Sequence, residues 1–128
     1  MRAQYHFRQS PQGLRAWNIQ RLVEISSTLP RERVPLSAIR ELDEPYWSRD
    51  PAQSITCRQI AEHARLIRDS DFSFPVIFSS DGRVMDGMHR ICKALLEGLS
   101  DIEAVRFLHD PEPDYLGIDP DDLPYDDD

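Results

Sequence analysis

The stretch Val84-Met85-Asp86-Gly87-Met88-His89-Arg90 decides the expected fold. Its apolar start is typical of the end of a strand, Asp-Gly makes a turn, and a helix begins with His-Arg in its first turn. The first N–H groups of a helix have no partner within the helix, and with the helix dipole they attract anions. Basic residues there are unfavourable by about 0.3–1 kcal/mol each unless an anion lies in front of them. The pattern therefore indicates an anion-binding site, and glycine lets a ligand approach the backbone closely.

A second interpretation of the same stretch stays open. Asp86 could be an ordinary N-cap, which stabilises a helix by about 1 kcal/mol. Arg90 could then pair with Asp86 or with Asp81 rather than with a ligand. The spacing alone does not separate this interpretation from an anion site.

Regular elements are expected on both sides of this stretch. Phe74–Phe78 and Arg83–Asp86 are predicted strands of a hairpin, because the Asp-Gly pair between them is a strong turn signal. The helix after Gly87 is expected to end at Gly98, where a left-handed residue followed by an apolar one is typical. Ile102–Leu108 is the last predicted strand.

The upstream part of the chain also alternates between helices and extended segments. A capping box, Thr56-x-x-Gln59, predicts a helix that ends near Asp69 and has an apolar face. Arg33–Leu36 is a predicted edge strand, since its proline cannot donate to a ladder. Residues 37–42 suit one helical turn, and 43–54 a loop. Ser10-Pro11 predicts the start of a helix that Pro30 closes.

This order of elements predicts an α/β (α+β) domain, with a mixed sheet and flanking helices. We expect three segments: an N-terminal helical extension over 1–32, a core over 33–109 and an acidic C-terminal tail over 110–128. The length of 128 residues suits about one domain. With 40% hydrophobic and 30% charged residues, the composition excludes wholesale disorder and a membrane protein. The N-terminus lacks the apolar core of a signal peptide, so a cytoplasmic location is expected.

The net charge of −8 is concentrated at one end of the chain. Nine of the 23 acidic residues and none of the 15 basic residues lie in 110–128, so the rest of the chain is close to neutral. A solvated, mostly extended tail is one expectation. The other is an acidic pseudo-ligand that folds over a basic site or docks on a protein partner.

The segment from Pro75 to Phe107 resembles the core of the ParB/sulfiredoxin-like superfamily. The resemblance rests on Asp81-Gly82, on Asp86-Gly87-Met88-His89-Arg90 and on Glu97-Gly98-Leu99, and Val34–Ile39 resembles the family's opening strand. It implies a small domain that binds the phosphates of a nucleotide, ATP or ADP, at the start of the helix. Gly87, Met88 and His89 would supply backbone contacts. His89 and Arg90 would contact phosphate with their side chains.

Two departures from the family narrow the expected activity. Sulfiredoxins carry a nucleophilic cysteine where this chain has Met88, and a thioether cannot form the thiolate. ParB proteins add a helix-turn-helix after this core, whereas an acidic tail follows here. Sequence-specific DNA binding by this chain alone is therefore not expected.

A branch of the superfamily that resembles free-serine kinases adds an acidic residue after the opening strand. Asp43 and Glu44 lie at a similar distance in this chain, with Glu41 also close. A carboxylate there would act as the base for a substrate hydroxyl, and Asp86 would help to hold Mg²⁺. The resemblance thus gives Asp43, Glu44 and His89 as candidate catalytic residues.

Three functions follow as hypotheses. The first is Mg²⁺-dependent phosphoryl or nucleotidyl transfer to a small hydroxyl compound or a protein. The second is a non-catalytic module that binds a nucleotide or, through its acidic tail, a partner. The third and weakest is a nuclease like those related to ParB.

Other residues carry weaker expectations. His63 is interpreted as a surface or boundary residue, and Tyr46 and Trp47 as pocket walls or as core under a loop. Cys92 is expected to be a buried structural thiol. The remaining histidines show no metal-ligand spacing.

Overall fold

The computed structural model describes residues 3–48 and 54–125. The strands are β1 (Tyr5–Ser10), β2 (Gly13–Asn18), β3 (Glu32–Pro35), β4 (Val76–Phe78), β5 (Val84–Asp86), β6 (Asp101–Arg106) and β7 (Tyr115–Leu116). The helices are α1 (Ile19–Ser26), α2 (Cys57–Asp69) and α3 (Met88–Leu96), with short 3-10 turns η1 (Leu36–Ala38), η2 (Arg40–Asp43) and η3 (Pro120–Asp122). No helix in these ranges is long and apolar enough to span a bilayer.

A four-stranded sheet in the order β3-β6-β4-β5 forms the centre of the molecule. β4 runs parallel to β6, and the β3–β6 and β4–β5 pairs are antiparallel. The sheet is therefore mixed and helices flank it, which confirms the expected α+β class. β3 lies at an edge, as its proline predicts. The β4–β5 hairpin is also confirmed.

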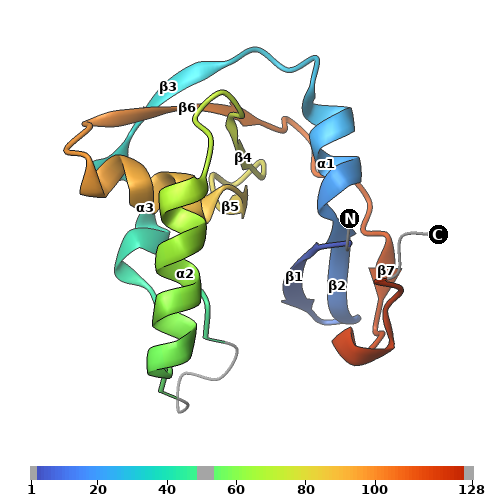
Figure 1. Ribbon diagram of the computed structural model, residues 1–128. Helices are drawn as coiled ribbons and strands as arrows, with labels where there is room; N and C mark the ends of the chain where they lie inside the picture. The colour runs from blue at the N-terminus through green and yellow to red at the C-terminus, as the bar shows by residue number, and fades with distance from the viewer. Residues whose placement is uncertain (1–2, 49–53, 126–128) are drawn as a thin grey trace.

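Both faces of this sheet are buried, because successive side chains of a strand point to opposite sides. Val76 and Phe78 pack with α3 and with the η1 turn in one apolar cluster. Ile77, between them, packs with Trp17 and Leu22 of the N-terminal segment in a second cluster. The central sheet thus joins α3 on one side to α1 and β2 on the other (Figure 1).

Helices α2 and α3 begin and end close to where the sequence predicts. The capping box of Thr56 and Gln59 is formed at the start of α2. Gly98 ends α3 with a φ of 75°, and the Leu99 N–H donates to the Ala94 carbonyl at 2.9 Å. α2 packs against α3 rather than against the sheet, and none of its residues is fully buried. Its expected apolar face is therefore largely exposed, with Ile60 at 53%.

The N-terminal segment is a β-hairpin followed by a short helix. The helix predicted from Ser10 to Pro30 is wrong before Ile19 and right from there to Ser26. The physical reason is the alternation of side chains over Tyr5–Asn18, which pairs β1 with β2 around Gly13. Gly13 has a φ of 123°, a conformation that interrupts a right-handed helix. The expected helical extension over 1–32 is thus strand for much of its length.

The described part of the acidic tail is docked on the N-terminal hairpin, although most of its residues are exposed as expected. β7 adds to β2 as an antiparallel strand, and the Trp17 indole N–H donates to the Pro111 carbonyl at 2.8 Å. Asp114 pairs with Arg21 at 2.9 Å, and Leu123 is buried. The tail lies beside the N-terminal hairpin, away from α2 and α3 (Figure 1). If the tail is a pseudo-ligand for a basic site, residues 110–125 do not cover the start of α3.

A leucine in the tail tests whether this segment belongs to the fold. We expect Leu123→Ala to lower the free energy of unfolding by about 2–4 kcal/mol, because the side chain is 5% exposed and its removal leaves a cavity. Chemical denaturation measures this difference. Ile118→Ala is the matched control, since Ile118 lies in the same tail but is 40% exposed. Equally small effects from both variants would mean that the tail does not pack.

Candidate functional site

Gly87 shapes the junction between β5 and α3. It is the N-cap of α3 with a φ of 111°, and no side chain caps the first turn. A Cβ at this position would lie 2.9 Å from Arg90 Nη2 and 3.0 Å from Val76 Cγ2, so only glycine fits without displacement. The N-cap is Gly87, and the interpretation of Asp86 as the N-cap is therefore wrong. Met88 points into the core and offers only its backbone to a ligand.

Asp86 and Arg90 form an ion pair across this junction. Arg90 Nη2 lies 2.8 Å from Asp86 Oδ2, and Arg90 Nη1 donates to the Phe74 carbonyl at 3.0 Å. Of the two partners suggested by the sequence, Arg90 therefore takes Asp86. The pair is only partly exposed, so neither charge is fully screened by solvent.

His63 and His89 form a flat, hydrogen-bonded pair that joins α2 to α3. His63 Nδ1 lies 2.9 Å from His89 Nε2, and the two ring centroids are 5.2 Å apart with planes 28° from parallel. Trp47 stacks on both rings, with centroid distances of 4.2 and 4.7 Å. Rings on opposite faces of the indole would lie much farther apart than 5.2 Å. Both imidazoles therefore lie side by side on one face of Trp47.

The surroundings of this pair favour neutral imidazoles. Burial lowers the pKa of His89 to about 4; His63 and Arg90 add to the lowering, and Asp86 opposes it. Burial also lowers the pKa of His63, against the opposing charge of Glu62. In neutral rings, one of the two nitrogens His63 Nδ1 and His89 Nε2 carries a proton and donates it to the other. If both nitrogens were protonated, neither could accept and the hydrogen bond would break. His63 does lie at a boundary, but sequence spacing gave no signal of its bond to His89.

The acidic residues after the opening strand have different surroundings. Glu44 makes two hydrogen bonds to the Arg83 guanidinium, which lower the pKa of its carboxyl. Asp43 is exposed at the end of η2. Glu41 is only 2% exposed, and its Oε2 accepts from the Val84 N–H at 2.7 Å. The buried Glu41 Oε1 has no partner within the described ranges, whereas both oxygens of Glu44 accept from Arg83.

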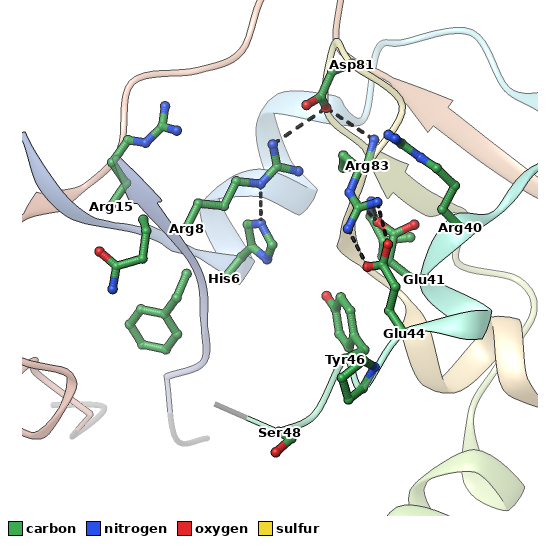
Figure 2. A pocket seen from close by; sticks show the side chains of 14 residues that line it. His6, Arg8, Arg15, Arg40, Glu41, Glu44, Tyr46, Ser48, Asp81 and Arg83 are labelled. Carbon is green, nitrogen blue, oxygen red and sulfur yellow. Dashed lines mark hydrogen bonds and ion pairs between the residues drawn. The ribbon is translucent and has the colours of Figure 1, made fainter. Parts of the chain in front are cut away.

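A cavity of about 820 Å³ lies between the N-terminal hairpin and the core. Figure 2 shows Arg8 and His6 of β1 facing Arg83, Glu44 and Tyr46 across it. Four arginines line the cavity: Arg8, Arg15, Arg40 and Arg83. The hairpin residues were not among the predicted site residues, because the segment was expected to be helical and distant in sequence from the motif.

Two ionisable groups in this cavity stay neutral at pH 7. Burial raises the pKa of Tyr46 to about 12, and the charges of Glu41 and Asp86 add to the effect. Burial, with the cation of Arg8 adding to it, lowers the pKa of His6 to about 4. Arg8 Nε donates to His6 Nε2 at 2.9 Å, which fixes that nitrogen as an acceptor. Tyr46 can therefore donate through its hydroxyl.

The predicted site residues other than Asp43 fall into two adjoining groups, and Asp43 belongs to neither. Asp86, Gly87, His89 and Arg90 meet at the start of α3, while Glu44 belongs to the cavity. Trp47 packs against the α3 core cluster and covers the histidine pair, and Cys92 is half-buried with a pKa raised by burial. Three or more His, Cys, Asp or Glu side chains do not come together as a metal-binding group in residues 3–48 and 54–125.

Comparisons with known proteins found no matching family model, curated protein or solved structure.

The histidine pair predicts a loss of stability in acid. The pKa of His89 is lower in the folded chain than its ordinary value of 6.5, so between pH 6.5 and about 4 the unfolded chain binds more protons. The free energy of unfolding should therefore fall as the pH falls through this window. We expect His89 to contribute about 1–2 kcal/mol, since its partial exposure weakens the effect.

Urea denaturation at several pH values, with NMR titration of the imidazoles, measures this effect. His89→Gln removes one titrating group and should make the acid side of the stability profile less steep, while His6, whose pKa is also lowered to about 4, keeps part of the slope. His109→Gln is the control, because His109 is exposed and outside the stack. An unchanged profile in His89→Gln would contradict the assignment.

Glu41 is expected to be the most important of the three acidic residues for stability. Glu41→Ala would leave the buried Val84 N–H without its acceptor and remove the 3.3 Å ion pair to Arg83 Nε. We expect a loss of about 2–4 kcal/mol in the free energy of unfolding. Denaturation of Glu44→Ala should show a smaller loss, because that carboxyl is exposed. The opposite order would contradict the assigned hydrogen bond.

Proposed function

We propose that this chain binds the phosphates of a nucleotide, ATP or ADP, at the start of α3. The observation that carries this proposal is the first turn of α3, which no side chain caps and which begins at the positive-φ Gly87 beside the Arg90 guanidinium. Free N–H groups and the helix dipole favour a phosphate at this end. The resemblance of the surrounding segment to the ParB/sulfiredoxin-like superfamily supports the same assignment.

The Asp86–Arg90 pair suits this role because each residue has a counterpart in a magnesium nucleotide. The guanidinium of Arg90 matches phosphate oxygens with two parallel hydrogen bonds. The carboxylate of Asp86 is a hard oxygen ligand, and its side chain is 23% exposed. Bound Mg²⁺ would neutralise charge on the phosphates. Without a nucleotide, the two side chains compensate each other's charge.

The reaction that fits these residues is phosphoryl transfer to a small hydroxyl compound or a protein. Glu41 is a better candidate base than Glu44, since its Oε1 has no partner among the described residues, whereas both oxygens of Glu44 accept from Arg83; the exposed Asp43 stays a candidate. Glu44 is engaged by Arg83, which lowers its basicity. Glu41 would take the proton of a hydroxyl brought within hydrogen-bond distance.

A non-catalytic binding module is the second candidate. It is favoured by α2, which carries apolar side chains such as Ile60 and Leu66 on an exposed surface. Its link to α3 includes the hydrogen bond between His63 and His89. A nucleotide that engages His89 would compete with this bond and alter how α2 is held.

Calorimetric titration of ATP, with and without Mg²⁺, tests the nucleotide site. We expect a Kd of about 1–100 μM for the wild type, weakened tenfold or more in Asp86→Asn/Arg90→Gln. The double variant removes both charges together and so leaves no buried ion unpaired. Arg58→Gln, on the exposed surface of α2, is the control. Absence of ATP binding by the wild type would overturn the proposal.

Glu41→Gln separates catalysis from binding. Glutamine retains an oxygen for the Val84 N–H but cannot take a proton at neutral pH. We expect ATP binding to persist and transfer to an acceptor to fall by about 100-fold or more. Turnover that survives in Glu41→Gln but not in Asp43→Ala/Glu44→Ala would return the role of base to those two residues.

A further inference from the structure

We propose that the cavity between the N-terminal hairpin and the core is a second binding site, for a small organic oxyanion such as a phosphate monoester or a carboxylic acid. It is separate from the start of α3. Its lining includes none of Asp86, Gly87, His89 and Arg90. Two of its arginines, Arg8 and Arg15, come from the hairpin, which lies outside the segment that resembles the ParB/sulfiredoxin-like core.

The first argument is the balance of charge around the cavity. Four arginines and three carboxylates line it, and His6 is neutral at pH 7. The carboxylates already have arginine partners. Glu41 and Glu44 pair with Arg83, and Asp81 lies 3.6 Å from Arg8.

Two of the arginines have no carboxylate at ion-pair distance, but the lining as a whole carries one net positive charge, because Arg83 pairs with both Glu41 and Glu44 and the charge of Arg40 also acts on Glu44. Neither Arg15 nor Arg40 has a carboxylate partner within residues 3–48 and 54–125. Arg15 lies over the Trp17 ring at 5.5 Å, which supports its stem but leaves its charge uncompensated by an anion. Arg15 comes from β2 and Arg40 from η2, so they approach the cavity from the hairpin and from the core. An anion between these elements would compensate both charges.

The second argument is independent of charge. In the described ranges, two buried side-chain polar atoms lack a hydrogen-bond partner, Arg15 Nε and Glu41 Oε1. Both belong to residues that line this one cavity. A buried polar group without a partner costs roughly 1–3 kcal/mol. One atom is a donor and the other an acceptor, and each lies just beneath the surface of the cavity.

The size and chemistry of the cavity match such a ligand. About 820 Å³ lies within the range of roughly 300–1,000 Å³ typical of small-molecule sites. Guanidinium groups present planar pairs of donors that match carboxylate and phosphate oxygens. The protonated hydroxyl of Tyr46 adds a neutral donor on the core side. Figure 2 shows Arg8 and His6 on one side of this space and Arg83, Glu44 and Tyr46 on the other.

The test uses the full chain and four probes: inorganic phosphate, ribose 5-phosphate, succinate and uncharged glycerol. Binding is followed by calorimetry and by NMR shifts of the Tyr46 and Val84 amides at constant ionic strength. We expect at least one anion to bind with a Kd of about 1 mM or tighter, and glycerol not to bind. Preference for ribose 5-phosphate or for succinate distinguishes the phosphate ester from the carboxylate.

Two matched variants locate the site. Arg15→Gln/Arg40→Gln removes the two arginines that have no carboxylate at ion-pair distance and should weaken anion binding tenfold or more. Arg58→Gln/Arg106→Gln removes the same net charge from exposed positions outside the cavity and should leave binding unchanged. The single variant Arg40→Gln serves as the test if the loss of Arg15 disturbs the fold, because Arg40 is exposed. It should weaken anion binding by about threefold or more.

Several outcomes would overturn the proposal. They are a Kd above about 10 mM for every anion, and equal weakening in both double variants. ATP binding that is lost in Arg15→Gln/Arg40→Gln but kept in Asp86→Asn/Arg90→Gln would show one nucleotide site in the cavity instead of two sites. If an anion binds the cavity but ATP does not bind the protein, the cavity site is supported and only the nucleotide site at the start of α3 is contradicted.

Discussion

The left-handed backbone of Gly87 is the constraint on which the start of α3 depends. It turns the chain from β5 into α3 within one residue, and no other side chain fits against Val76 and Arg90. The turn brings Asp86 and Arg90 to 2.8 Å and directs His89 toward α2. Because α2 has no fully buried residue, its position depends on contacts such as this one. The geometry of one glycine is thus linked to the position of a whole helix.

The parts of the fold that local rules govern were predictable from the sequence. The capping box fixes the start of α2, Asp-Gly fixes the β4–β5 turn, and Gly98 fixes the end of α3. Each depends on residues within a few positions of one another, whose preferences hold in most surroundings. The run Val76-Ile77-Phe78 is apolar at every position, which is typical of a strand buried on both faces. In the structure Val76 and Phe78 pack on one face and Ile77 on the other.

The N-terminal hairpin and the tail were not predictable in this way, because pairing between distant segments decides their structure. The tail was expected to be solvated from its charge, yet it supplies a third strand to the hairpin and an acceptor for the Trp17 indole. Its acidic residues are accommodated because Arg21 pairs with Asp114 at the edge. The charge of the tail predicts how this segment would behave in isolation. It cannot predict that Arg21, about 90 positions earlier in the sequence, supplies a cation to Asp114.

The candidate site likewise contains residues that a local motif predicts and residues that only long-range contacts bring together. Gly87, Asp86 and Arg90 were identified from one short motif, and they do lie together. The stack of Trp47, His63 and His89 joins three segments with no shared spacing, so no periodicity indicates it. The same holds for Arg8 and Arg15, which reach the cavity only because the hairpin folds back onto the core.

Two consecutive residues connect the start of α3 with the cavity. Tyr46 lines the cavity, and Trp47 covers the histidine pair. Their rings meet edge to face at 6.2 Å, so a displacement of one changes the packing of the other as well as the backbone they share. The charges of Glu41 and Asp86 both act on Tyr46, which places its hydroxyl within the electrostatic influence of both sites. A ligand that binds Tyr46 in the cavity therefore acts on the neighbour of Trp47, the residue that stacks on His63 and His89.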